Sequence, residues 1–352
     1  MRQTCFYSKA IALITIFTII LSSCASKKMV GPFVTDVKTF PAQYHITLPY
    51  TNHCKTSPIV QLSINGKIRN FIFDTGATMI ISEKLYQELE LSSKDTTKIT
   101  DAAGNTQKTP YTYIPEIKME DVSFFNIPTY ILKKQSNTFW DFYDVDGVVG
   151  SNLFHNSIVK ITSKDKTITL SNSADIIPKD IKPLKISYSK FQKNPHVMLK
   201  CFQGNRKANI EVLFDTGYNG LIDIAESYLS GLKQKRIKPE AKCYYGASSA
   251  TMFGTSKLDS IYTFKFDSVQ FNNSALNNIS ASTEHRAKIG FEVTNYGEVT
   301  IDYIKNRFYF NPKGYPEYKT EKVQPISYLP KDNSLIVGII KDESLLSEIE
   351  LG

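Results

Sequence analysis

The residues best suited to chemistry are two aspartates in matching contexts. Asp74 and Asp215 each end a short apolar run and are each followed by Thr and Gly, in residues 71–76 (Phe-Ile-Phe-Asp-Thr-Gly) and 212–217 (Val-Leu-Phe-Asp-Thr-Gly). Two carboxyl groups within hydrogen-bonding distance of one water can act together, one ionised as general base and one protonated as general acid. The pair therefore predicts hydrolysis that needs no metal and no covalent intermediate.

The sequence around the second aspartate repeats the organisation around the first. Asp74 lies 76 residues before Gly150, and Asp215 lies 75 residues before Gly290. Each half also has a helix-like stretch and a closing strand of alternating pattern, at residues 83–89 and 158–162 in the first and 224–229 and 298–302 in the second. A repeat kept in register over this length predicts two homologous halves folded face to face.

The elements that must position each aspartate are short strands and a sharp turn. Residues 59–64 read as a strand, Asn65-Gly66 as the hairpin turn after it, and the apolar run before Asp74 as the returning strand. Gly76 and Gly217 stand where the backbone turns sharply and passes close to its opposite number, which leaves no room for a Cβ.

With a later apolar-apolar-Gly sequence in each half, these motifs resemble the pepsin-like and retropepsin-like aspartic peptidases, in particular those found among bacterial lipoproteins. The likeness spans about residues 56–312, and it departs in the second half, where Lys288 takes an apolar position before Ile289-Gly290. It implies an all-β fold of two acid-protease-like β-barrel lobes with a few short helices.

The resemblance also implies the function and the role of each motif residue. It implies an aspartic endopeptidase that acts on extended polypeptides through a dyad of Asp74 and Asp215, without a cofactor. Thr75 and Thr216 would form hydrogen bonds between the lobes. One alternative is a catalytically weak or inactive peptide-binding protein with a protease-like cleft, and another is a homodimer that uses only the first lobe.

The residues after each motif differ from the pepsin-like pattern. Ala77 and Tyr218 stand where those enzymes carry Ser or Thr, so neither offers a short hydroxyl to the carboxylate. Losing a hydrogen bond to the charged form raises the pKa of a carboxyl, which predicts an activity optimum at about pH 5 to 7. Thr78 and Asn219 are expected to bond the outer carboxylate oxygens instead.

A mobile flap over the cleft is expected in each half, because a lid excludes water and clamps the substrate. The candidates lie about 30 residues beyond each aspartate, around Gly104 in residues 101–105 and around Gly246 in residues 244–248. Plain hairpin tips are the alternative. Flaps would let the cleft bind an extended chain through its backbone, as in strand addition.

The N-terminus predicts export and lipidation. Residues 1–24 contain a basic start, an apolar run and Leu-Ser-Ser-Cys, which resembles a bacterial lipoprotein signal that would make an acylated Cys24 the first mature residue. An ordinary cleaved signal with a chance cysteine is the alternative. We expect a lipid anchor in the cell envelope, at a periplasm-facing outer membrane, and a tether over residues 25–55.

The remaining chain divides into lobe 1 (56–180), lobe 2 (181–314) and an extension (315–352). The extension has a strand-like run and then a helix-like one, and it resembles the opening of a PDZ domain; a truncated remnant is favoured over a strand and helix packed on lobe 2. One disulfide is conceivable among Cys54, Cys201 and Cys243.

Other classes of function find little support in the sequence. The histidines lack metal-ligand spacing, the net charge of +8 is spread along the chain without a nucleic-acid motif, and no Gly-rich phosphate loop occurs. We therefore expect a monomer with two pseudo-symmetric lobes, a polypeptide substrate and no bound metal or nucleic acid.

Overall fold

The computed structural model describes residues 37–52, 57–133, 143–188, 192–240, 243–313, 326–331 and 334–340, together with residue 351. All of these residues belong to one compact unit, Phe33–Gly352. The structure is 58% strand and 10% helix, so the predicted all-β class with two acid-protease-like lobes is confirmed.

Lobe 1 is a closed six-stranded mixed β-barrel. Its strands are β3 (Ile59–Ile64), β4 (Lys67–Asp74), β5 (Ile80–Ser82), β7 (Thr106–Met119), β8 (Val122–Leu132) and β9 (Gly147–Gly150). They are hydrogen-bonded in the order β3-β4-β9-β5-β8-β7, and the pairing of Ser63 with Lys118 closes the ring. Around it lie β1 (Lys38–Phe40), α2 (Glu83–Glu88), β6 (Asp95–Thr100) and the 3-10 turn η1 (Ser151–Leu153). The β3–β4 turn has positive φ at Asn65 and Gly66, as the predicted hairpin requires.

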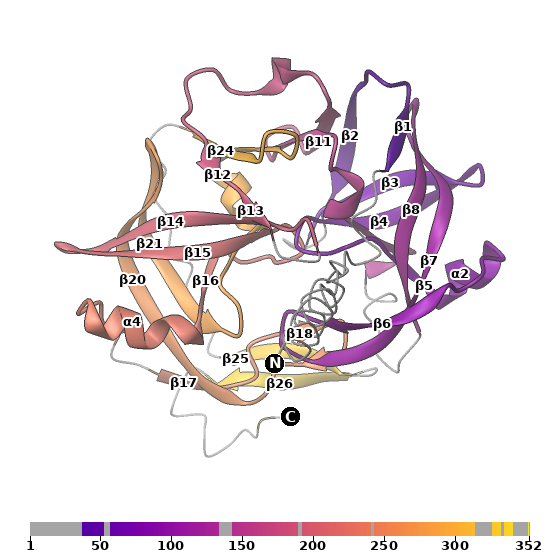
Figure 1. The fold of residues 1–352 in the computed structure, drawn as a ribbon. Helices are drawn as coiled ribbons and strands as arrows, with labels where there is room; N and C mark the ends of the chain where they lie inside the picture. The colour runs from indigo at the N-terminus through magenta and orange to yellow at the C-terminus, as the bar shows by residue number, and fades with distance from the viewer. Residues whose placement is uncertain are drawn as a thin grey trace, which may run out of the picture. The chain divides into compact units, whose positions relative to one another are not determined.

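Lobe 2 is a second closed six-stranded barrel with the same strand order. Its strands are β14 (Pro195–Gln203), β15 (Arg206–Asp215), β16 (Ile222–Ala225), β20 (Asp259–Phe271), β21 (Ser274–Glu284) and β22 (Lys288–Gly290). They are bonded in the order β14-β15-β22-β16-β21-β20, and β14 pairs with β20 to close the ring. Figure 1 shows β14, β15, β20 and β21 grouped apart from β3, β4, β7 and β8 of lobe 1.

Further elements surround the second barrel. They are β13 (Ser187–Tyr188), β17 (Cys243–Gly246), β18 (Ala250–Thr251), β19 (Gly254–Thr255), α4 (Leu229–Gln234), and the 3-10 turns η3 (Glu226–Tyr228) and η4 (Phe291–Asn295). The expected helix at residues 224–229 therefore begins late, because residues 222–225 continue as β16 and pair with both β21 and β22. Helical structure starts only where that pairing ends.

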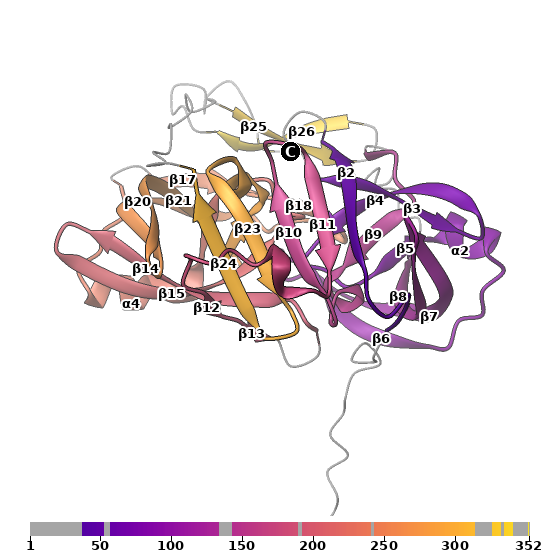
Figure 2. The ribbon, with the colours of Figure 1, turned by 90° about the horizontal axis from the view of Figure 1, so that it is seen from above.

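The strands that close each half pair with each other and join the lobes. The sheet contains β12 (Leu184–Lys185), β24 (Arg307–Pro312), β23 (Gly297–Asp302), β10 (Ile158–Thr162), β11 (Thr167–Ser171) and β2 (His45–Thr51) in that order. β10 and β23 run antiparallel, with Val159 opposite Ile301. Figure 2 shows β24, β23, β10 and β11 between the two barrels. The short turn η2 (Ala174–Ile176) follows β11.

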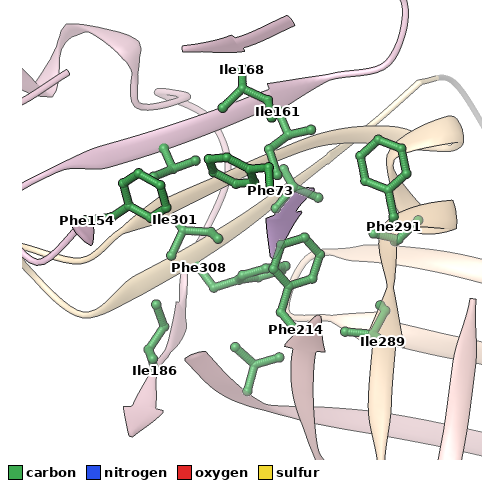
Figure 3. Close-up of a cluster of buried hydrophobic side chains, with 14 of the residues drawn as sticks. Phe73, Phe154, Ile161, Ile168, Ile186, Phe214, Ile289, Phe291, Ile301 and Phe308 are labelled. Carbon is green, nitrogen blue, oxygen red and sulfur yellow. The ribbon is translucent and has the colours of Figure 1, made fainter. Parts of the chain in front are cut away.

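The residues just before the two aspartates pack into a core that both halves share. Phe73 stacks on Phe154 with ring centroids 5.0 Å apart, and Phe214 meets Phe308 edge-on at 5.1 Å. All four rings are fully buried. Figure 3 shows them gathered with Ile161 and Ile301 of the joining sheet. Phe73 and Phe214 therefore anchor the C-terminal ends of β4 and β15 in the shared core.

Part of the predicted tether is folded. Residues 45–51 form β2, which pairs with β11 and β3 and alternates buried and exposed side chains along its length. The tether prediction is therefore wrong for this stretch, because Ile46, Leu48 and Tyr50 bury one face of a strand. Residues 1–36, with the predicted signal, Cys24 and the start of the tether, lie outside the described residues. Among those described, no helix has the length and apolar character to cross a membrane.

The C-terminal extension adds to lobe 2. Strands β25 (Ile326–Lys331) and β26 (Ser334–Ile340) form a hairpin, and β26 pairs with β17 at Tyr245 and Gly246. This arrangement favours local packing on lobe 2 over the PDZ-like remnant. The expected helix at residues 343–349 lies outside the described residues.

Candidate active site

Each aspartate stands at the end of a strand that is paired on a glycine. Asp74 ends β4 opposite Gly150 of β9, and Asp215 ends β15 opposite Gly290 of β22. A Cβ on Gly150 would lie 2.4 Å from the backbone of Thr78, and one on Gly290 would lie 2.1 Å from a backbone oxygen. The glycine opposite each aspartate thus leaves space for the loop that follows the aspartate to fold back over the strand.

The two carboxyl groups face each other across the lobe boundary. A Cβ on Gly76 would lie 2.5 Å from Cγ of Asp215, and one on Gly217 would lie 2.3 Å from Oδ2 of Asp74. Each motif glycine also donates its N–H to its own aspartate, at 2.7 Å for Asp74 Oδ1 and 2.9 Å for Asp215 Oδ1. Each carboxyl is therefore held by its own loop and lies against the glycine of the other.

The two threonines join the loops through four reciprocal hydrogen bonds. Thr75 Oγ1 donates to Phe214 O at 2.7 Å and accepts from Thr216 N at 3.1 Å. Thr216 Oγ1 donates to Phe73 O at 2.7 Å and accepts from Thr75 N at 3.0 Å. Both side chains are fully buried. These are the bonds between lobes that the resemblance implied, and they fix the separation of the two strand ends.

The proximity of the carboxyls changes their acid–base chemistry. The pKa of Asp74 is raised well above its ordinary value, first because the surrounding protein removes water from it and next because the charge of Asp215 lies beside it. A hydrogen bond with Asp215 acts in the same direction, while the N–H groups of Gly76 and Gly217 oppose the rise. Such a pair holds one proton between two carboxyls over a wide range of pH.

Comparison with known families agrees with this geometry. Residues 60–153 match the aspartyl protease family. The matched segment contains Asp74, Gly150 and most of the first barrel, and it suggests aspartic peptidase activity. No curated protein matches the chain.

The loops that carry the two aspartates are linked by a second pair of contacts between lobes that sequence reasoning missed. Ser57, just before β3, donates to Gly217 O at 2.9 Å, and Asn194, just before β14, donates to Gly76 O at 2.5 Å. The two residues occupy equivalent places in the repeat but differ in type. Their roles depend on the way the lobes meet, so a single sequence offers no signal for them beyond their position before the first strand.

Thr78 and Asn219 do not bond the carboxylates as expected. Thr78 Oγ1 is buried and has no hydrogen-bond partner among the described residues. Asn219 Oδ1 accepts from Ser57 Oγ at 3.1 Å, and Asn219 also bonds to the Tyr143 side chain. The pKa of Tyr143 is raised, mainly by burial and also by the nearby charge of Asp74. Asn219 thus belongs to a contact between lobes and places a tyrosine beside the aspartate pair.

A cavity of about 340 Å³ opens above the two carboxyls and is lined by both lobes. The tip between β6 and β7 borders it through Asp101 and Ala102, so the lobe 1 flap candidate lies at the cavity. Gly104, at this tip, has positive φ and approaches the His285 ring of lobe 2, since a Cβ there would lie 2.8 Å from Nε2.

The second flap candidate lies elsewhere. Gly246 is inside β17, where it pairs with β20 and β26, and a Cβ there would lie 2.2 Å from Gly338 O. The lobe 2 hairpin that reaches the cavity is β18–β19, with Met252 and Phe253 at its tip. The lobe 2 flap candidate is therefore the β18–β19 tip and not the stretch around Gly246. Pairing with β26, which is distant in the sequence, holds Gly246 within a sheet.

The two hairpin tips meet over the cavity. Asp101 accepts hydrogen bonds from Thr251 Oγ1 at 2.6 Å and from Phe253 N at 3.2 Å, and it also caps its own turn through the N–H groups of Ala103 and Asn105. Met252 and Phe253 pack against the apolar cluster of lobe 1 that borders the site. The cavity is therefore covered from both lobes.

The other side chains with possible redox or metal chemistry are the cysteines and the remaining His, Asp and Glu residues. Cys201 is buried and Cys243 exposed, and both are free thiols, so the disulfide considered above does not involve either of them; Cys54 lies outside the described residues. Within the described ranges, no group of three or more His, Cys, Asp or Glu side chains is placed to hold a metal ion.

Proposed function

We propose that the chain is an aspartic endopeptidase in which Asp74 and Asp215 form the catalytic dyad. The observation that carries the proposal is the reciprocal placement of the two carboxyls, each against the motif glycine of the other lobe. The family match over lobe 1 and the raised pKa of Asp74 support it. Since one chain supplies both lobes, a second subunit is not needed to complete the pair, and we propose that the enzyme acts as a monomer.

The reaction starts with one proton held between the two carboxyls. With that proton on Asp74, the Asp215 carboxylate takes a proton from a water as the water oxygen bonds to the scissile carbonyl carbon. Asp74 gives its proton to the carbonyl oxygen, which forms a tetrahedral diol. On collapse, the C–N bond breaks, Asp215 protonates the leaving nitrogen and a diol hydroxyl returns a proton to Asp74. The dyad thus ends in its starting state.

An extended polypeptide is the substrate that fits this cleft. The cavity runs between two barrels and is covered by two hairpins whose strands offer backbone groups to a bound chain. Met252 and Phe253 occupy space over the lobe 1 wall, so the hairpin contact at Asp101 must open to admit substrate. Closure would then exclude water around the dyad.

The test is cleavage of a denatured protein by the full chain in detergent, from pH 3 to 8, beside Asp74→Asn and Asp215→Asn. Asp302→Asn is the matched control, because Asp302 is a fully buried aspartate outside the cavity. Loss of activity in both site variants, with the control active, supports the dyad within one chain. Loss with Asp74→Asn alone would indicate a lobe 1 homodimer, and no cleavage by the parent would favour a peptide-binding protein.

We also propose that the enzyme is held in the cell envelope by acyl chains on Cys24, facing the periplasm from the outer membrane. The lipoprotein-like sequence of residues 1–24 supports this. Cys24→Ser should move the protein from the membrane fraction to the soluble fraction without changing peptidase activity per molecule. Retention of Cys24→Ser on membranes would contradict a lipid anchor at this residue.

A further inference from the structure

The lobe 1 side of the cleft is apolar. Ile80 of β5 pairs with Val148 of β9, and both line the cavity together with Ile72 and Tyr130. These side chains belong to one buried hydrophobic cluster. A substrate side chain that enters here meets carbon atoms, so this side favours an apolar residue.

The equivalent strand positions in lobe 2 are occupied by charged residues. Asp223 of β16 pairs with Lys288 of β22, so Asp223 takes the place of Ile80 and Lys288 that of Val148. Lys288 and the exposed Arg286 line the cavity on this side. Asp223 lies behind Lys288, buried and away from the cavity lining.

The Lys288 ammonium carries more N–H donors than its contact with Asp223 uses. Its Nζ lies 3.6 Å from Asp223 Oδ2 and 4.3 Å from the centre of the Tyr218 ring, and its side chain is only 6% exposed. An ammonium carries three N–H donors, and among the described residues Asp223 is its one ion-pair partner. Arg286 has no ion-pair partner within the described part of the chain.

Substrate binding would make those donors costly to leave unpaired. A bound chain displaces water from the cavity, and a buried donor without a partner is unfavourable. A carboxylate of the substrate can accept from both Lys288 and Arg286, whereas an apolar side chain satisfies neither and a basic one is repelled. Glu284, another buried carboxylate of lobe 2, already accepts hydrogen bonds from the Ser248 hydroxyl and the His285 N–H.

Resting on the proposed peptidase function, we propose that the enzyme selects peptide bonds flanked by an apolar residue on one side and an acidic residue on the other. Lobe 1 binds the apolar side chain, and Lys288 with Arg286 of lobe 2 binds the carboxylate. Each barrel thus supplies one aspartate of the dyad, whereas the two barrels bind different kinds of substrate side chain.

The test uses peptides that differ only in the two residues at the scissile bond: Leu-Leu, Leu-Glu, Glu-Leu, and the Gln and Lys counterparts of each acidic peptide. At pH 6 the Glu side chain is ionised. One order of Leu and Glu should be cleaved with a kcat/KM about tenfold above its Gln counterpart, as expected for a hydrogen bond to a charged group, and the Lys peptide should be the poorest. Higher salt should reduce the preference.

Two variants separate recognition from folding. Arg286→Gln changes an exposed residue, and the double variant Asp223→Ile with Lys288→Val recreates the lobe 1 pair without leaving a lone buried charge. Both should lose most of the preference for Glu over Gln, measured within each variant as the ratio of kcat/KM for the two peptides. Equal rates for Glu and Gln peptides in the parent, or an unchanged preference in both variants, would overturn the inference.

A binding measurement keeps the inference testable apart from catalysis. Fluorescence anisotropy of the same peptides with Asp74→Asn should show tighter binding of the Glu peptide than of its Gln counterpart. If the parent cleaves Leu-Leu but neither measurement favours Glu, the inference fails and the peptidase function stands. If the parent cleaves none of the peptides, the peptidase function fails, and the anisotropy result alone decides whether this side of the cleft recognises acidic chains.

Discussion

The strand pairs β5–β9 and β16–β22 occupy equivalent places in the two barrels but are built from opposite chemistry. The first presents Ile80 and Val148, and the second presents Asp223 and Lys288. At the ends of the neighbouring strands β4 and β15, the motif residues Thr75 and Thr216 make the same reciprocal contacts in both lobes. The comparison teaches that a two-fold arrangement constrains the groups that must meet on its axis, while the pocket walls beside the axis remain independent of each other.

The largest expected effect tests the symmetric part of the comparison. Gly76→Ala would place a Cβ 2.5 Å from Asp215 Cγ, and Gly217→Ala would place one 2.3 Å from Asp74 Oδ2. Each should displace the opposite carboxyl and lower kcat by about 100-fold or more, since small misplacements of reacting groups are that costly. The measurement is steady-state cleavage of one peptide.

Gly231→Ala is the matched control, because that glycine of α4 has open space around its Cα. It should leave activity unchanged. If Gly76→Ala abolished activity and Gly217→Ala did not, the two lobes would not contribute equally, and the symmetric part of the comparison would fail.

The second prediction concerns the asymmetric pair itself. Lys288→Val leaves Asp223 buried without its cation and should reduce the free energy of unfolding by about 3 kcal/mol or more. Asp223→Ile combined with Lys288→Val should recover most of this loss, because a well-packed apolar pair often replaces a buried ion pair without cost. Urea denaturation measures both. A double variant as unstable as the single one would show that lobe 2 does not tolerate the apolar pair found in lobe 1.

Much of the motif geometry could be predicted because the motif occurs twice in matched repeats and resembles that of the aspartic peptidases. The resemblance implies the threonine bonds between the lobes, and the sharp turn at each Gly requires a close approach of the two loops. The strand at residues 45–51 was also readable, since Ile46, Leu48 and Tyr50 alternate with polar or exposed positions. It lies before the repeat begins, so the comparison of the two halves gives no support for it.

The features that escaped prediction depend on partners far away in the chain. Ser57 and Asn194 act on the opposite lobe, so their importance appears only when the lobes are assembled. The spacing in lobe 1 predicts a lobe 2 flap around Gly246, but β26 pairs with β17 there, and the hairpin tip at the cavity is that of Met252 and Phe253. Lys288 read as a departure from the motif, and its partner Asp223 could not be identified without the pairing of β16 and β22.

The third prediction uses the pKa of Asp74 to compare the dyad with a neutral version of itself. A carboxyl whose pKa is raised in the folded state contributes stability that is fully present below its unfolded pKa, near 3.8, and is lost as the pH rises through its folded pKa. Asp74→Asn cannot ionise. It should therefore melt a few degrees above the parent at pH 7 and lose that advantage at about pH 3 to 4. An equal difference at both pH values would contradict a shared proton.

The smallest expected effect concerns the contact that covers the cavity. Asp101 of lobe 1 accepts from Thr251 Oγ1 and Phe253 N of the lobe 2 tip, and the Asn105 side chain adds a bond to Thr255 O. Asp101→Ala removes these acceptors and should raise KM a few-fold with little change in kcat, because the lid closes less firmly while the dyad is untouched. Thr251→Val removes one of the two bonds from the lobe 2 tip to Asp101, and it leaves the Phe253 N–H bond and the Asp101 turn bonds in place.

The two variants together show what the lid does. If Thr251→Val raises KM as much as Asp101→Ala, the bond between the tips sets the closed state. If only Asp101→Ala has an effect, the carboxylate acts through the Phe253 N–H bond or by shaping its own turn through Ala103 and Asn105. A fall in KM for both would mean that the contact holds the cleft shut against substrate, with Met252 and Phe253 competing for the apolar wall of lobe 1.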